Sequence, residues 1–230
     1  AIVDAMKPKF IEGGKKNGHD PAVLEKIWGD WEKFASYAFN KSHATCYSWV
    51  AYQTAYLKAH HPAEYMAAVM SRNLDNITEI TKLMDECKAM GIPTLGPDVN
   101  ESWQKFSANH HGEIRFGISA IKSVGGAAAD VIIEEREKNG PYKNIFDFIQ
   151  RVNLSACNRK CVESLVLSGG FDSFGSMKRE DFFAKNTKGE TFIETLIRYG
   201  QLYQNEMAQA RNSLFGGDNA VEIATPPIIK

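Results

Sequence analysis

The sequence predicts a mainly α-helical fold, with a long helical N-terminal part, a small second helical domain and a flexible C-terminal tail. Apolar residues recur every three or four positions through most of residues 1–95, as they do on one face of a helix. From Gly91 onward the helical patterns are shorter and are separated by glycine and proline. The segment from Gln209 onward has glycine and proline punctuation and no helical period, which predicts a tail or linker.

Composition and charge exclude several classes of protein. The 230 residues are 43% hydrophobic and 24% charged, so a disordered, collagen-like or disulfide-scaffold protein is excluded. Lys plus Arg number 27 and Asp plus Glu 28, which gives a formal net charge of −1. A polycation that coats nucleic acid by charge alone is therefore excluded, and any nucleic-acid contact must be local. No apolar run approaches the ~20 residues of a membrane-spanning helix, so we expect no membrane contact.

The four cysteines lack CxxC spacing, which favours reduced thiols in a cytoplasmic protein. Cys157 and Cys161 are four residues apart, but no second pair of ligands stands nearby. We expect small buried thiols here rather than zinc ligands, and no metal site or cofactor in this chain.

The helices of residues 1–95 have recognisable starts and ends. Asp20 followed by Pro21 is a strong helix start, an N-cap residue before proline at the first helical position. A loop at residues 39–43 separates this helix from a second, Ala- and aromatic-rich one. Pro62 begins a third helix, and a fourth ends at Gly91.

The second part of the chain alternates short elements. An extended connector with two prolines covers residues 92–102, and a short strand or extended entry is expected at residues 112–118. Residues 117–137 are expected to form two short helices around a glycine turn. Further helical patterns cover residues 141–152, 158–168, which a double glycine ends, and 179–203.

Residues 118–132 carry the strongest local signal and resemble a helix-hairpin-helix motif. Gly125 and Gly126 allow a tight turn and a close approach of the backbone to a phosphate. At the start of the following helix, the free amides and the helix dipole favour the negative charge of that phosphate. Lys122 adds a charge-assisted contact, and Ser123 stands where this motif often has glycine. The alternative is a glycine turn between two packing helices. The predicted DNA-binding residues are Lys122, Ser123, Val124, Gly125, Gly126 and Ala127.

Two further observations support nucleic-acid binding more weakly. Residues 136–160 contain six basic residues (136, 138, 143, 151, 159 and 160) and only two acidic ones, although such basic runs usually lie on a solvent-exposed surface. Residues 158–172 fit a degenerate second hairpin stacked on the first.

Earlier in the chain, Lys41, Ser42 and His43 stand at a helix start, where they suit a phosphate. The alternative there is capping by Ser42 beside a surface lysine.

Several long segments together resemble the alpha subunit of bacterial DNA polymerase III. They are FASYAFNKSHATCYSWVAYQTAYLKAHHPAEYMAAVMS, ECKAMGIPTLGPDVNES, IRFGISAIKSVG, GPYKNIFDFIQRV and SGGFDSFG, in this order within residues 7–176. The resemblance implies that residues 1–95 are the C-terminal part of the fingers. It implies a tandem helix-hairpin-helix domain at residues 96–176 that grips duplex DNA, and a helical extension with a clamp-binding tail at residues 177–230. It also places Lys41, Ser42 and His43 near the incoming nucleotide or the primer end.

The tail resembles the internal peptide by which this family binds the beta sliding clamp. Ser213, Leu214 and Phe215 match the usual pattern, and the apolar pair is the expected anchor for a hydrophobic pocket. Arg211 stands where the family prefers glutamine, which places the polar contact in doubt. The resemblance implies other polymerase III holoenzyme subunits as further partners.

The family's parent enzyme is a DNA-directed DNA polymerase, which uses carboxylates of its palm, including an Asp-x-Asp pair, to hold two Mg²⁺ ions. This sequence contains no Asp-x-Asp and opens with Ala inside a helical pattern, so we expect a fragment without catalytic residues and without activity of its own.

Two other functions compete with this interpretation. One is a stand-alone helix-hairpin-helix protein of DNA repair or a scaffold. The other is a helical enzyme that uses His60, His61, His110 or His111, although these pairs have no carboxylate or cysteine at ligand spacing.

Overall fold

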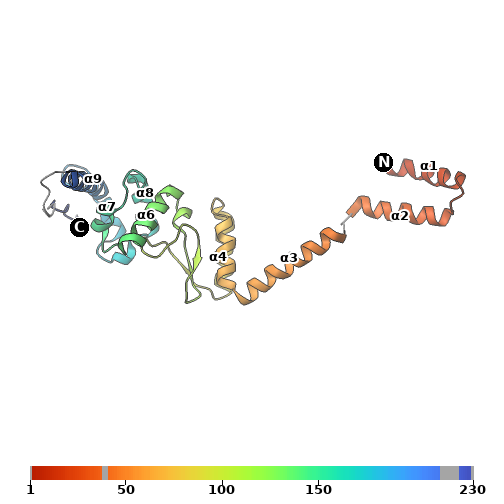
Figure 1. The fold of residues 1–230 in the computed structure, drawn as a ribbon, viewed down its shortest axis with the longest axis horizontal. Coiled ribbons are helices and arrows are strands. Elements are labelled where there is room, and N and C mark those ends of the chain that lie inside the picture. Colours follow the sequence, from red (N-terminus) through yellow and green to blue (C-terminus); the bar gives the residue numbers. More distant parts are fainter. Residues whose placement is uncertain (1, 38–40, 213–222, 229–230) are drawn as a thin grey trace. The chain divides into compact units, whose positions relative to one another are not determined.

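A computed structural model describes residues 2–37, 41–212 and 223–228 (Figure 1). The predicted mainly α fold is confirmed, since helices dominate and the strands form one small sheet. The chain divides into two compact units, residues 1–57 and residues 58–230, with the division inside one helix. Among the described residues, no helix has the length and apolar character needed to cross a membrane.

The first unit contains α1 (Ile2–Lys16), α2 (Pro21–Tyr37) and most of α3 (Lys41–His60). The predicted start of α2 is confirmed, because the Asp20 carboxylate accepts a hydrogen bond from the Ala22 amide at 2.9 Å. Leu24 and Trp28 of α2 are buried against α1, and the Phe10 ring lies 5.4 Å from the Trp28 ring. Leu24 and Trp28, one helical turn apart, thus hold α1 and α2 together. The rest of the predicted apolar stripe is not buried, since Val23, Ile27, Trp31 and Phe34 are exposed.

The helix α3 begins earlier than predicted. Residues 41–43 were expected in a loop, but they form the first turn of the helix. The Thr45 hydroxyl donates to the Lys41 carbonyl at 2.9 Å, an i to i−4 contact that belongs to a helical turn.

The second unit begins with helices packed on a three-stranded sheet. The helices are α4 (Pro62–Arg72), which Pro62 begins as predicted, and α5 (Ile77–Ala89). The strand order is β1 (Thr94–Leu95), β3 (Ile114–Arg115) and β2 (Ser107–Ala108), with β3 parallel to β1 and antiparallel to β2. The strand expected within residues 112–118 is therefore present. The core between helices and sheet is formed by Ala63, Met66, Ala67, Met70, Ile80, Cys87, Ile92, Phe106 and Ile114.

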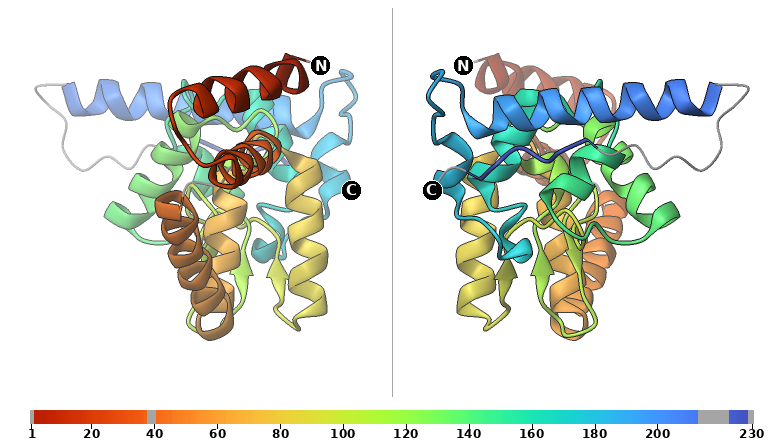
Figure 2. Two further views of the ribbon diagram at one scale, coloured as in Figure 1. Left: turned by 90° about the vertical axis from the view of Figure 1, so that its right-hand side faces the viewer. Right: turned by 90° about the vertical axis from the view of Figure 1, so that its left-hand side faces the viewer.

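A second core organises the helical module that follows. Its elements are the one-turn 3₁₀ helix η1 (Ile118–Ala120), α6 (Gly126–Asn139), α7 (Ile145–Arg151), α8 (Arg159–Ser168), η2 (Asp172–Phe174), η3 (Arg179–Phe183) and α9 (Phe192–Asn212). Figure 2 shows α9 (blue) as a long helix, and α9 packs on α7 and α8. The module therefore buries one continuous core from Val99 to Tyr199.

The division into compact units differs from the predicted boundaries at residues 95 and 176. The first core joins residues on both sides of 95, because the apolar faces of α4 and α5 pack on the sheet that follows them. The second core includes Phe192, Ile193 and Leu196, so α9 packs into the module instead of extending from it.

Two predicted helices differ from the structure. The predicted helix before the glycine turn is only the short η1, because Ile121 to Gly125 leave helical geometry. The helix predicted at residues 179–203 is interrupted, since Lys185 pairs with Thr191 across a turn with Gly189 at φ +80°. The Asn186 side chain accepts hydrogen bonds from the Lys188 and Glu190 amides and stabilises this turn. The helix α9 then continues to Asn212, past the start of the predicted tail.

Candidate nucleic-acid interface

The first hairpin, residues 117–127, is held by its backbone and by three apolar side chains. The amides of Ile118 and Ser119 donate to the carbonyls of residues 103 and 104 at 2.9 and 3.0 Å. The Val124 amide donates to the Ile121 carbonyl at 3.0 Å, and Ile118, Ile121 and Val124 are buried. The residues between and after these anchors, 122–123 and 125–127, are exposed. The apolar anchors thus present a short stretch of backbone to the outside.

The start of α6 leaves amides available for a ligand. Gly125 is the N-cap, no side chain caps the helix, and the Gly125 carbonyl accepts from the Ala128 and Ala129 amides at 3.1 Å. The amides of Gly126 and Ala127, in the first turn, have no acceptor within the helix. Together with the positive end of the helix dipole, they make a site that favours an anion.

The fold itself does not require glycine at position 125. Its φ of −77° and ψ of 168° are open to any residue. A Cβ placed on Gly125 would meet no heavy atom within 4 Å. The missing side chain therefore leaves open space in front of the α6 amides, as a close approach of an external group requires.

The backbone needs its left-handed residue two positions earlier. Ser123 has a φ of +68°, and among the residues that the structure describes it is the single non-glycine residue with a positive φ. This is the position where the motif often has glycine, so the turn keeps its shape although the residue has changed. A non-glycine residue in this region costs roughly 1–2 kcal/mol.

An open hollow lies beside the hairpin, and tertiary structure alone brings three residues from outside the hairpin to it. Leu74 and Asp75, between α4 and α5, and Gln104 line the hollow together with residues 119–126. The Gln104 side-chain amide donates to the Asp130 carboxylate at 3.0 Å. The Ser119 hydroxyl, also in this wall, is buried and has no hydrogen-bond partner within the described part of the chain. Sequence reasoning missed Asp75 and Gln104, because they lie more than ten residues away from the hairpin along the chain and carry no motif.

The helix-hairpin-helix motif family matches residues 91–181. DNA polymerase III subunit alpha from Vibrio cholerae is 46% identical over 166 residues, 72% of this chain and 14% of that protein. The Chlamydia muridarum subunit is 45% identical over 81% of this chain and 15% of its own length. The Pasteurella multocida subunit is 40% identical over 92% and 18%. The chain matches a segment of the DNA polymerase III alpha subunit. It spans about one sixth of the length of these curated relatives.

The second hairpin was predicted at residues 158–172, but these residues form α8, the double glycine and the start of η2. In the structure, residues 152–158 join α7 to α8, and we call this connection the second hairpin. Asn158 caps α8 by accepting a hydrogen bond from the Cys161 amide at 3.1 Å, and Asn153 accepts from the Ser155 amide at 2.9 Å. Cys157 and Cys161 are buried, with their sulfur atoms 3.4 Å apart. The contact with Cys161 and burial both raise the pKa of Cys157 far above that of an ordinary thiol. The expectation of small buried thiols is confirmed.

Three of the six basic residues predicted to support binding are engaged inside the segment. The Arg136 side chain is buried, donates to the Val99 carbonyl at 2.9 Å and lies over the Trp103 ring. Burial lowers the Arg136 pKa from its usual value. Arg159 pairs with Glu163 at 2.7 Å and with Glu194 of α9 at 2.6 Å.

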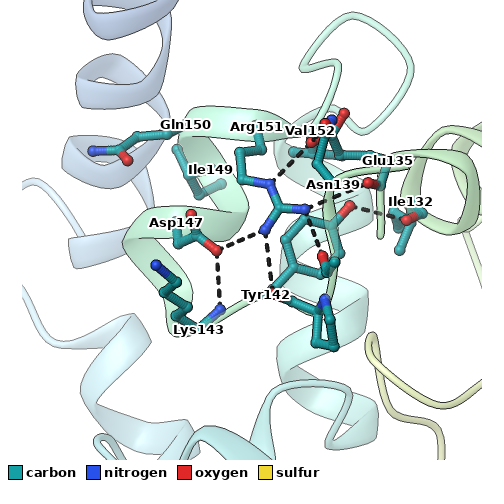
Figure 3. A network of polar contacts seen from close by, with 12 residues as sticks. Ile132, Glu135, Asn139, Tyr142, Lys143, Asp147, Ile149, Gln150, Arg151 and Val152 are labelled. Atoms are coloured by element: carbon teal, nitrogen blue, oxygen red, sulfur yellow. Dashed lines mark hydrogen bonds and ion pairs between the residues drawn. The ribbon is translucent and has the colours of Figure 1, made fainter. Parts of the chain in front are cut away.

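Arg151 is the centre of a polar network (Figure 3). Its guanidinium pairs with Glu135 at 2.9 Å and with Asp147 at 2.8 Å, and it donates to the Gly140 carbonyl at 2.6 Å. The guanidinium also lies over the Tyr142 ring, 4.6 Å from its centre. Arg151 therefore joins the end of α6 to α7. The remaining three residues, Lys138, Lys143 and Lys160, are exposed.

The other predicted site residues belong to α3 and to the C-terminal segment. Lys41, Ser42 and His43 are exposed in the first turn of α3, where the His43 ring contacts the Tyr47 ring at 4.2 Å. Ser213, Leu214 and Phe215 lie outside the described residues.

Proposed function

We propose that this chain is part of a replicative DNA-directed DNA polymerase and that its first hairpin binds duplex DNA. The observation that carries the proposal is the uncapped start of α6, preceded by a glycine that the fold does not require. The match to alpha subunits over 72–92% of the chain favours this function over a stand-alone repair or scaffold protein and over a histidine-dependent enzyme.

The bound group on the DNA is a backbone phosphate. The amides of Gly126 and Ala127 donate to its oxygens, and the exposed Lys122 adds a charge. Because phosphates are the same in every sequence, this binding has no sequence preference. Since the contacts are few, we expect a log–log salt slope on the order of one to three.

The decisive experiment compares two valine substitutions in the 230-residue chain. Gly125→Val fills the space in front of the α6 amides, whereas Gly96→Val fills open space outside the hollow. We expect Gly125→Val to weaken binding to primed duplex DNA at least tenfold at low salt, and Gly96→Val to leave it unchanged. Thermal melting checks that both variants remain folded. Equal DNA binding by both would remove the hairpin from the interface.

We propose that nucleotide addition depends on residues outside this chain. The sequence has no Asp-x-Asp, and the residues that the structure describes bring together no group of three His, Cys, Asp or Glu that could hold a metal ion. The residues present therefore do not fit the Mg²⁺ pair of polymerases, which we assign to the palm. The chain alone is expected to extend no primer, and extension above a control without protein would contradict this.

Lys41, Ser42 and His43 are proposed to contact the incoming triphosphate or the primer end in the complete polymerase. Their position in the first turn of α3 supports this, because amides at a helix start favour phosphate. In the full-length subunit, Lys41→Ala should raise the nucleotide KM about tenfold or more, since a charged contact is worth ~1.5–3 kcal/mol. Unchanged kinetics would leave these residues with a role in the helix start alone.

The C-terminal segment is proposed to bind the beta sliding clamp through Ser213, Leu214 and Phe215, and so to join the chain to other holoenzyme subunits in the bacterial cytoplasm. Burying the two apolar side chains contributes ~3–6 kcal/mol before ordering costs. A peptide of residues 209–218 should bind the cognate clamp with micromolar affinity, and replacing Leu214 and Phe215 by alanine should abolish binding. No binding of the wild-type peptide at hundreds of micromolar clamp would overturn the proposal.

A further inference from the structure

We propose that Arg72, at the end of α4, is a second DNA-binding residue, so that the duplex spans the hollow from the first hairpin to the turn between α4 and α5. This inference rests on the proposed DNA binding by the first hairpin. It adds a contact from a segment that lies outside the helix-hairpin-helix motif and that tertiary structure brings to the hollow.

Arg72 differs from the other arginines that the structure describes, because its charge has no partner among the described residues. The others each form an ion pair with a carboxylate; they are at positions 115, 136, 151, 159, 179 and 198. Arg72 is exposed, and the described part of the chain gives its guanidinium neither an ion pair nor a hydrogen bond. The planar fork of N–H groups of an arginine suits a phosphate, which it binds through two parallel hydrogen bonds.

The fold places the end of α4 at the hollow beside the first hairpin. The turn that follows α4 lines this hollow together with residues 119–126. The Ser71 hydroxyl donates a hydrogen bond to the Phe106 carbonyl at 3.2 Å, and this bond ties the end of α4 to the segment that forms another part of the wall. Arg72 therefore lies at the edge of the hollow that the hairpin does not form.

The size of the hollow decides how a duplex meets it. The hollow is open and has a volume of about 640 Å³. The major groove of B-form DNA alone is about 12 Å wide, so a hollow of this volume is too small to take up a duplex. A duplex with a phosphate at the start of α6 therefore lies across the mouth of the hollow and reaches the turn between α4 and α5.

The edge at this turn needs a cation if DNA is to cross it, because it carries the exposed carboxylate of Asp75. A carboxylate and a phosphate repel each other, and solvent and salt weaken this repulsion without removing it. Arg72, three residues before Asp75, supplies the opposite charge. The group that it binds is a phosphate of the DNA backbone, so the contact adds affinity and no sequence preference.

Titrations of duplex DNA with the 230-residue chain at several salt concentrations test this role. Arg72→Ala should weaken binding at low salt about three- to tenfold and reduce the log–log salt slope by about one. Arg72→Lys should keep the slope, because it keeps the charge. The matched control is Lys88→Ala, since Lys88 is an exposed cation in the last turn of α5 and lines a different hollow. This control should leave both affinity and slope unchanged.

The hairpin variants separate this role from the proposed hairpin function. If Lys122 and Arg72 bind different phosphates, the slope lost in the double alanine variant is the sum of the two single losses. If Gly125→Val weakens binding while Arg72→Ala behaves like Lys88→Ala, Arg72 does not bind DNA and the hairpin function stands. If neither Gly125→Val nor Arg72→Ala has an effect, the hairpin function fails as well. Weaker binding by Arg72→Ala at an unchanged slope, with a lower melting temperature, would identify a structural role of Arg72 and overturn its contact with DNA.

Discussion

Both hairpins of the helical module lead into a helix, but they differ in how the start of that helix is capped and in what lies next to it. The first leads into α6 through two glycines, and no side chain caps that helix. The second leads into α8, which Asn158 caps, and its residues Leu154 and Ser155 line a hollow with residues of α9. The first hairpin therefore suits an external phosphate, because the backbone amides at the start of α6 have no side-chain cap. The second hairpin suits contact with α9, because side chains of the chain itself bind its backbone groups.

The contact of α9 with the second hairpin is close and specific. The Gln204 side-chain amide donates to the carbonyls of Ile149 at 3.0 Å and Val152 at 2.8 Å, which are at the end of α7. A Cβ on Gly200 would overlap the Ile149 side chain and lie 3.0 Å from Leu154. The close packing of α9 on α7 thus explains why position 200 is glycine, whereas a Cβ on Gly125 would lie in open space.

The largest expected effect breaks the network that joins α6 to α7, beside the second hairpin, and spares the first hairpin. Arg151→Ala removes the partner of Glu135 and Asp147, whose side chains are each 22% exposed. Since truncating one member of a partly buried ion-pair network leaves charge unpaired, we expect a loss of roughly 3 kcal/mol in the free energy of unfolding. Urea denaturation measures this, with the exposed Lys143→Ala as control. A change below about 1 kcal/mol would show that the network contributes little.

Replacing the two glycines by alanine sharpens the comparison. Gly200→Ala should lower the free energy of unfolding by roughly 1–2 kcal/mol, because overlap with α7 outweighs the better helix propensity of alanine. Gly125→Ala should leave it within about 0.5 kcal/mol. Thermal and urea unfolding of both variants give the values. Equal losses at the two positions would mean that the space in front of Gly125 closes in solution.

The two exposed lysines beside the hairpins test which one meets DNA. Lys122→Ala should weaken duplex binding several-fold and reduce the log–log salt slope by about one, as expected for one lost phosphate contact. Lys160→Ala, at the start of α8, should change neither. Titrations at two salt concentrations decide between them, and a loss of slope in Lys160→Ala would show that both hairpins grip the duplex.

The smallest expected effect concerns the turn itself. Ser123→Gly places glycine at φ +68° and removes a cost of roughly 1–2 kcal/mol. The greater freedom of glycine in the unfolded chain offsets part of this gain, so we expect a net stabilisation of about 0.5–1 kcal/mol. Thermal melting measures it, and a lower melting temperature would show that the Ser123 side chain makes a compensating contact.

Short-range features of the sequence predicted their elements well. Asp20 and Pro21 begin α2, Pro62 begins α4, and the double glycine after Ser168 ends α8, because each acts through neighbours within a few residues. The same reasoning failed at residues 184–191, where an Asn186 turn and a bridge interrupt an otherwise helical composition. It also overestimated how many basic residues are available to bind DNA, since three of the six have partners within the chain that sequence spacing alone does not identify.

By itself, the sequence determined the helical character, the position of the hairpin at residues 122–127 and the family that the chain matches. These depend on local periodicity, on glycine and proline, and on long runs of shared residues. Only the tertiary structure decided that Gln104 and Asp75 lie beside that hairpin, that Arg136 and Arg151 are internal, and that α9 covers the second hairpin. Such neighbours depend on how the apolar cores bring distant segments together, and no local pattern along the chain records the pairing.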